Sequence, residues 1–162
     1  SLESIQEVMS RLMSTKLGAY LDIAHSYLAM TKRSVYIDNH SHEAQDGRRT
    51  RIRPADRRYF FVYPFVKTRE WYQLPFEQRQ EIMDAHIKLG TKYSRVKLNT
   101  TYSFGIDDQE FVVGFETDSP SDFLDLVMEL RGVEGSLYTF SDTPIFTCIH
   151  RPVAETLDSL GG

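Results

Sequence analysis

The sequence predicts an α+β protein in which two helices cover one face of an antiparallel sheet. Three observations lead to this fold class. From residue 59 onward, strand-like and helix-like apolar patterns follow one another in the order β-α-β-β-α-β, which is the ferredoxin-like arrangement. The 162 residues suffice for one ordinary domain or two small ones. Hydrophobic residues make up 41% and charged residues 26%, a globular composition.

The first 36 residues predict one helix and one strand. Apolar side chains recur at helical spacing over residues 1–13, and Gly18 ends this helix. Residues 25–35 alternate as in a strand. Aligning Ser1 with Ser119 superposes these two elements on a similar helix and strand near the C-terminus. We therefore expect residues 1–36 to be the closing helix and strand of an earlier ferredoxin-like module, which is only partly present.

The elements after residue 58 have clearer boundaries. Strand 59–66 carries apolar side chains at both its odd-numbered and its even-numbered positions, so we expect both faces of its sheet to be covered. Helix 76–92 follows Pro75, and helix 120–131 begins with a cap residue, Ser119, followed by proline. The other predicted strands span 96–106, 110–117 and 143–149. Together these elements form one complete module over residues 59–150, followed by a C-terminal tail over 151–162.

Composition excludes several classes of partner. The net charge of −4 does not favour nucleic acid, although residues 37–58 form an Arg-rich loop. That loop lacks interleaved aromatic residues, so we interpret it as solvated. No apolar run is long enough for a membrane span. The single cysteine, Cys148, rules out a disulfide framework and fits a reducing, cytoplasmic location.

One candidate site follows the end of strand 59–66. Side chains alternate along a strand, so Tyr63, Phe65 and Lys67 project to the same face. A phenol, an apolar contact and a cation in one line suit a flat, aromatic, negatively charged ligand. The alternative is a buried tyrosine beside a lysine whose charge reaches water.

Two further patterns point to the same kind of ligand. His86 faces the core from helix 76–92, and no cysteine or carboxylate stands at zinc-ligand spacing beside it. Haem iron needs only one protein ligand, so a lone histidine suits haem, whereas a hydrogen-bonded structural histidine is the alternative. Arg131 ends helix 120–131 and Ser136 follows it; a cation at a helix C-terminus is also favoured by the helix dipole.

Four stretches taken together resemble the chlorite dismutase superfamily, above all its coproheme decarboxylase branch. They are YPFVKTREWYQLP, MDAHIKLGTKY, SFGIDDQEF and ELRGVEGS. The resemblance covers essentially the whole chain. It implies two ferredoxin-like modules of the dimeric α+β barrel type, packed sheet on sheet, with about 80 residues of the first module absent. It also implies a homopentamer that binds coproheme or haem b in the second module.

The resemblance implies a role for each candidate residue. His86 matches the iron ligand, Tyr63 the catalytic tyrosine, and Lys67 a basic residue that takes part in catalysis and binds a propionate. The other matches around the porphyrin are Trp71, Arg131, Ser136 and, through the loop, His40. The implied reaction is the oxidative decarboxylation of coproheme to haem b in haem biosynthesis, with hydrogen peroxide as oxidant. In it, a radical at Tyr63 takes hydrogen from a propionate β-carbon.

Two positions depart from the chlorite dismutases themselves. Leu98 stands where they have a distal arginine, and Gly135 where they have a carboxylate that orients the proximal histidine. We therefore expect no chlorite chemistry, with Lys97 and Arg95 as the nearest cations that would change this expectation. The alternatives are a haem-binding peroxidase-like or chlorite dismutase-like protein, and a cofactor-free ferredoxin-like module that oligomerises through its sheet face.

Overall fold

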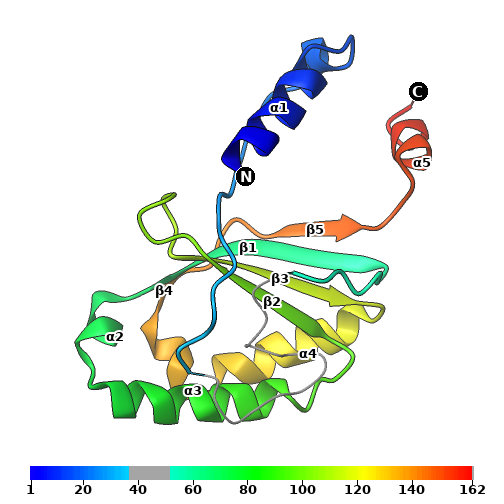
Figure 1. Cartoon of the computed structure of the whole chain (residues 1–162). Coiled ribbons are helices and arrows are strands. Elements are labelled where there is room, and N and C mark those ends of the chain that lie inside the picture. The colour runs from blue at the N-terminus through cyan, green and yellow to red at the C-terminus, as the bar shows by residue number, and fades with distance from the viewer. Residues whose placement is uncertain (37–51, 162) are drawn as a thin grey trace.

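The structure is a computed structural model that describes residues 1–36 and 52–161. Its centre is a five-stranded antiparallel sheet with two long helices, α3 (Phe76–Gly90) and α4 (Pro120–Arg131), on one face (Figure 1). The strands are β1 (Tyr59–Lys67), β2 (Lys97–Tyr102), β3 (Phe111–Thr117), β4 (Thr139–Ser141) and β5 (Phe146–Ile149). They lie in the order β2-β3-β1-β4, and β5 also pairs with β1. The predicted ferredoxin-like fold class is confirmed.

The core lies between the sheet and the two helices. β1 pairs with β3 from Tyr59–Thr117 to Phe65–Phe111, which places the odd-numbered side chains of both strands on the helix-covered face. There Phe61 stacks on Phe123 of α4 with ring centroids 4.1 Å apart. The buried members of this core are Phe61, Tyr63, Val96, Phe115, Phe123 and Leu126.

The sheet edge beside β1 is made by two short strands. β5 pairs with the first half of β1, from Tyr59 to Val62, and β4 pairs with its end, at Val66 and Lys67. Between them, residues 63–65 of β1 have no paired residue on this side within the described chain. Pro64, which has no N–H to donate, lies in this gap. The strand predicted over 143–149 therefore begins only at Phe146.

Helix boundaries agree with the sequence where cap residues mark them. α1 (Leu2–Met13) begins after Ser1, whose side chain accepts a hydrogen bond from the Ser4 amide, and α4 begins after Ser119 in the same way. The helix predicted over residues 1–13 ends at Met13, and Gly18, which was expected to end it, lies in a separate short 3₁₀ helix. Five short elements were not predicted, because so few residues show no recognisable period. They are η1 (Gly18–Tyr20), α2 (Arg69–Gln73), the 3₁₀ helix η2 (Glu134–Tyr138), β4, and α5 (Val153–Asp158) in the expected tail.

The strand expected over residues 25–35 is not formed. Only Met30 pairs with the sheet, through two hydrogen bonds of 2.8 Å with Tyr102. β2 ends at Tyr102, and the chain then turns through Gly105, whose φ of 70° is left-handed. Residues 25–35 thus form a single bridge with the edge of β2, at Tyr102, and not a continuous ladder of strand hydrogen bonds.

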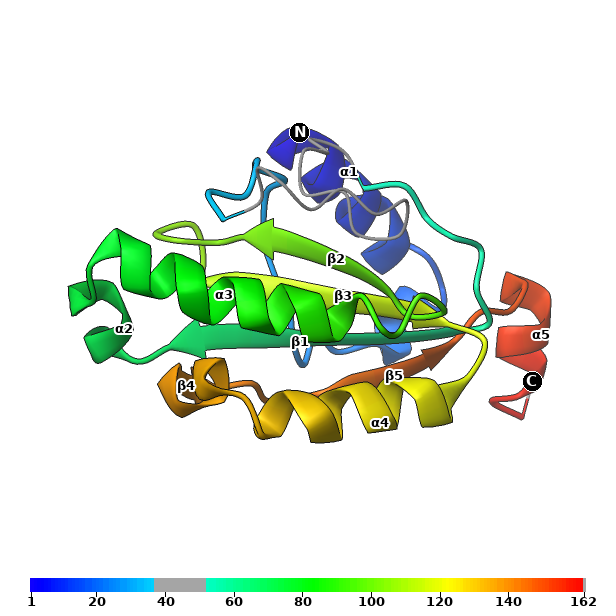
Figure 2. The ribbon, with the colours of Figure 1, turned by 90° about the horizontal axis from the view of Figure 1, so that it is seen from below.

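The outer face of the sheet, opposite α3 and α4, is only partly covered. Phe60 lies on it with its ring against Gly114, where an added Cβ would approach the ring to 2.7 Å. Among the described residues no helix or strand packs on this face, and α1 lies beyond it (Figures 1 and 2). A hollow of about 460 Å³ remains, bordered by residues 52–57 and the strands. The rings of His25 and Tyr27 also contact Phe146 of β5, which lies on this outer face because it pairs with Val62. The cover expected from the apolar pattern is therefore limited to these short segments. None of the described helices is long and apolar enough to cross a membrane.

Candidate functional site

The candidate site lies on the helix-covered face of the sheet, where the end of β1 meets α2, α3 and η2. Tyr63 and Lys67 share this face, as the strand alternation predicts. Tyr63 is 8% exposed and stacks on Phe115 with ring centroids 5.9 Å apart. Its hydroxyl makes no hydrogen bond to any described residue, so the phenol presents an unpartnered oxygen at the site.

Lys67 is a partly buried cation held by backbone and aromatic groups. Its Nζ donates a hydrogen bond of 2.9 Å to the Gly135 carbonyl and lies 4.5 Å from the centroid of the Trp71 ring. Within the described chain no carboxylate forms an ion pair with it. Burial lowers the pKa of Lys67 to about 8, while the charge of Glu110 acts in the opposite direction. The ammonium is therefore mostly retained at neutral pH and has capacity for an anion.

His86, on α3, faces Gly135 of η2. A Cβ added to Gly135 would lie 3.8 Å from His86 Nδ1, so residue 135 presents only its backbone to this nitrogen. Burial lowers the pKa of His86 to about 4, with the charge of Lys67 acting in the same direction. The imidazole is thus neutral at pH 7 and makes no hydrogen bond to another described residue. A neutral imidazole with a free lone pair is the form that binds a metal.

Arg131 and Ser136 lie nearby but already have partners. The Arg131 guanidinium forms an ion pair with Asp142, and the Ser136 hydroxyl donates 2.8 Å hydrogen bonds to the carbonyls of Arg131 and Val133. Burial raises the pKa of Tyr63 to about 12, with Asp142 adding to the shift and Arg131 opposing it. The phenol is therefore protonated at neutral pH, and the charges of Asp142 and Arg131 both act on it.

Trp71 forms a wall of the site from α2. It is 2% exposed, and its ring lies 5.4 Å from Tyr138 and 6.2 Å from Tyr36, centroid to centroid. A buried aromatic wall suits the flat ligand that the sequence predicts. His40, the predicted distal histidine, lies outside the described residues.

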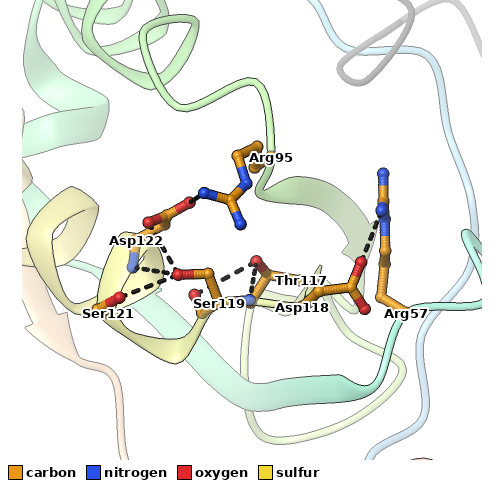
Figure 3. Close-up of polar contacts among 7 residues, drawn as sticks. All are labelled: Arg57, Arg95, Thr117, Asp118, Ser119, Ser121 and Asp122. Atoms are coloured by element: carbon orange, nitrogen blue, oxygen red, sulfur yellow. Dashed lines mark hydrogen bonds and ion pairs between the residues drawn. The ribbon is translucent and has the colours of Figure 1, made fainter.

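The two cations closest in sequence to Leu98 do not reach its side of the sheet. Leu98 packs against the core on the helix-covered face. Lys97 lies on the opposite face and pairs with Glu116 at 3.5 Å. Arg95 pairs with Asp122 at 3.3 Å at the start of α4, where the Ser119 cap also lies (Figure 3). Neither Lys97 nor Arg95 therefore lies beside the Leu98 side chain.

Sequence reasoning missed several polar residues of the site. Glu110 accepts hydrogen bonds from the Lys67 amide at 2.8 Å and from the Tyr72 hydroxyl at 2.6 Å, which fixes α2 against β1. Asp142 comes close to Arg131 only through the fold, so no local signal could have found it.

These residues fit a metal porphyrin with carboxylate arms. A neutral imidazole can bind the metal, Trp71 offers a flat apolar wall, and Lys67 offers a cation to a carboxylate. Tyr63 places a protonated phenol on the same side of the sheet.

Comparison with known proteins gives one family. The sequence model of the family described as chlorite dismutase matches residues 1–151. A coproheme decarboxylase from Mycolicibacterium smegmatis is 30% identical over 148 residues, covering 91% of this chain and 62% of that protein. A putative heme-binding protein from Halobacterium salinarum is 32% identical over 146 residues, covering 81% and 30%. The chain thus spans less than two thirds of the length of these relatives.

Solved structures show the same fold over the whole chain. Chlorite dismutase from Candidatus Nitrospira defluvii, in complex with imidazole, superposes with a TM-score of 0.84 at 26% identity, covering 100% of this chain and 69% of that one. A heme-binding protein from Thermus thermophilus gives a TM-score of 0.85 at 26% identity, covering 99% and 68%.

Proposed function

The chain belongs to the chlorite dismutase family, and from this premise we propose that it binds coproheme and decarboxylates it to haem b with hydrogen peroxide. The observation that carries the proposal is that Lys67 and His86 both approach Gly135 of η2, with Tyr63 on the same face of the sheet. The 30% identity to a coproheme decarboxylase supports it. A cytoplasmic homopentamer acting in haem biosynthesis belongs to the same proposal.

His86 would hold the iron in this proposal. Its imidazole is neutral at physiological pH because burial and the charge of Lys67 both disfavour protonation. Binding therefore needs no proton to leave, and the absence of a hydrogen-bonding partner among the described residues leaves the ring free to turn toward the metal.

The cations would bind the carboxylates of the substrate. Coproheme carries four propionates, and the Lys67 ammonium faces the site without a carboxylate partner in the described part of the chain. Burying the Lys67 ammonium costs free energy, and a charge-assisted hydrogen bond from this ammonium to a ligand carboxylate offsets that cost. Arg131 would have to share its guanidinium between Asp142 and a propionate, and Trp71 would pack against the ring.

Tyr63 would carry the hydrogen transfer. The bound iron supplies the oxidising power of peroxide. With its pKa raised to about 12, the phenol loses its electron and proton together rather than the proton alone. The resulting radical takes a hydrogen atom from a propionate β-carbon, and carbon dioxide leaves to give a vinyl group. Each vinyl formed releases two electrons and one proton. One hydrogen peroxide accepts these, together with one further proton from the solvent, and becomes two waters.

A titration followed by mass spectrometry tests this function. Adding coproheme should give a Soret band of saturable intensity, and adding peroxide should then remove one carbon dioxide and two hydrogens in each of two steps. A bound porphyrin whose mass stays unchanged would reject the decarboxylase and leave a haem-binding or peroxidase-like protein. A chain that gives no Soret band at all would favour the cofactor-free module.

A further inference from the structure

Arg79 on α3 is a cation to which the proposed function gives no role. Its Nε is buried and has no hydrogen-bond partner among the described residues. Nη1 donates only a long hydrogen bond of 3.4 Å to the Tyr36 hydroxyl, and the guanidinium carbon lies 5.8 Å from the centroid of Phe76. Within the described chain no carboxylate pairs with it. Three other arginines, Arg57, Arg95 and Arg131, each have such a partner.

The position of Arg79 relates it to the candidate iron ligand. It lies seven residues before His86, so the two side chains leave the same face of α3, about 10 Å apart along the axis. This separation is comparable to the radius of a porphyrin with its propionate arms. Tyr36, the partner of Arg79, also contacts Trp71, and Trp71 faces Lys67. Arg79 and Lys67 therefore stand at two sides of one aromatic wall.

The energetics of the free protein favour a ligand at this position. A buried hydrogen-bond donor without a partner costs stability, and Nε of the half-buried Arg79 is such a donor. A guanidinium presents Nε and Nη donors in one plane, which matches the two oxygens of a carboxylate. A ligand carboxylate would supply the missing partner of Nε.

We propose that Arg79 is a carboxylate-binding subsite of the porphyrin pocket, acting beside Lys67. The ligand class is a porphyrin propionate, so the inference rests on the proposed function. It adds a specificity-determining residue on the α3 side of the pocket.

Binding measurements on three variants test this subsite. We would titrate iron coproporphyrin III and haem b into each protein, follow the Soret band, and record the thermal midpoint of the ligand-free protein. Arg79→Met should weaken coproporphyrin binding about 10- to 100-fold, the range expected for hydrogen bonds to a charged group. Its midpoint should stay unchanged or rise, because a buried donor without a partner is removed. Arg79→Lys should lie between, and Arg95→Met, at the surface, should match the wild type.

The outcomes distinguish a failure of the Arg79 subsite from a failure of the proposed function. Wild-type protein that binds neither porphyrin overturns both. Wild-type binding with equal affinity in Arg79→Met overturns the subsite alone, as does a loss accompanied by a lower thermal midpoint, since that marks a structural role. A loss confined to coproporphyrin supports the subsite and assigns Arg79 to a propionate that the reaction consumes. An equal loss for both porphyrins at an unchanged midpoint supports it and assigns Arg79 to a retained propionate.

Discussion

His86 has a glycine and a lysine beside it where a strongly donating histidine would have a carboxylate. Gly135 presents only backbone near Nδ1, and the charge of Lys67 disfavours a proton on the ring. A carboxylate partner makes a metal-bound imidazole a stronger donor. Without it, His86 would be a weak axial ligand, suited to holding a porphyrin that is itself transformed and then released.

Removing the imidazole should abolish porphyrin binding or weaken it severely. In His86→Ala the iron loses its protein ligand, while the fold should persist because no described residue depends on a hydrogen bond from this ring. The Soret band measures binding, and circular dichroism measures the fold. His150→Ala, at an exposed histidine beside Asp56, is the matched control. Unchanged affinity and an unchanged axial-ligand spectrum in His86→Ala would contradict the assignment.

Removing one oxygen from Tyr63 should separate binding from chemistry. Tyr63→Phe keeps the stacking on Phe115 and loses no hydrogen bond to a described residue, so coproheme affinity should stay within a few-fold of the wild type. Decarboxylation should stop, because phenylalanine cannot give up a hydrogen atom in the same way. Tyr59→Phe, four residues earlier on the same face, should remain active. Loss of two carbon dioxide masses from porphyrin in Tyr63→Phe would refute the radical role.

The sequence could predict those site residues whose geometry is local. Strand alternation places Tyr63 with Lys67, and helical spacing turns His86 to the core. It could not predict Asp142, which meets Arg131 only because β4 and α4 are neighbours in the fold. The partners of Ser136 also follow from the tight turn of η2, which has too few residues to show a period.

At the scale of elements, the sequence predicted helix starts that local cap residues mark, but it did not predict which segments pair as strands. Ser119 and Pro120 mark the start of α4 because a cap satisfies free amides within one turn. Residues 25–35 alternate as a strand does, yet strand pairing needs a neighbour that alternation does not reveal. The described chain offers them the edge of β2 only at Tyr102.

The segment around Leu28 is held by the turn after β2, and one substitution should loosen it. Asp107 accepts hydrogen bonds from the Leu28 amide at 2.7 Å and from Gln109 at 3.0 Å. Asp107→Asn removes the charge that strengthens these bonds, so hydrogen exchange at the Leu28 amide should speed up several-fold at neutral pH. Asp108→Asn, the exposed neighbour, should leave it unchanged. Equal exchange rates in both variants would show that Asp107 does not hold the segment.

The same carboxylate predicts the direction of a pH effect. Hydrogen bonds from Leu28, Gln109 and Asp108 lower the pKa of Asp107 below 3.8. The folded state therefore favours the ionised carboxylate. The stability that this carboxylate contributes to the fold is fully present above the pKa that Asp107 has in the unfolded chain. It is lost as the pH falls through the lowered pKa. Protection of the Leu28 amide should decline in that acidic window and not near neutrality.

For the whole molecule, two apolar surfaces lack cover within the described chain. α1 exposes Leu2, Ile5 and Val8, and the outer sheet face retains its hollow beside Phe60. Exposed apolar surface of this kind marks an interface. We therefore expect light scattering to give a mass above the 18.8 kDa of one chain. A monomer at micromolar concentration would remove the homopentamer from the proposal for this chain.

The arrangement of charges across the sheet decides whether chlorite can be a substrate. Chemistry on such an oxyanion depends on a fixed, poorly screened positive charge near the developing chlorine–oxygen species. Leu98 provides none, Lys97 is held on the opposite face by Glu116, and Arg95 is held at the start of α4 by Asp122. We expect negligible oxygen release from chlorite, with bleaching of bound haem instead. An oxygen electrode with coproheme-loaded and haem-loaded protein measures this. Sustained release at roughly 1–1000 per second, the range of a competent enzyme, would contradict the decarboxylase assignment and mean that a cation outside the described residues reaches Leu98.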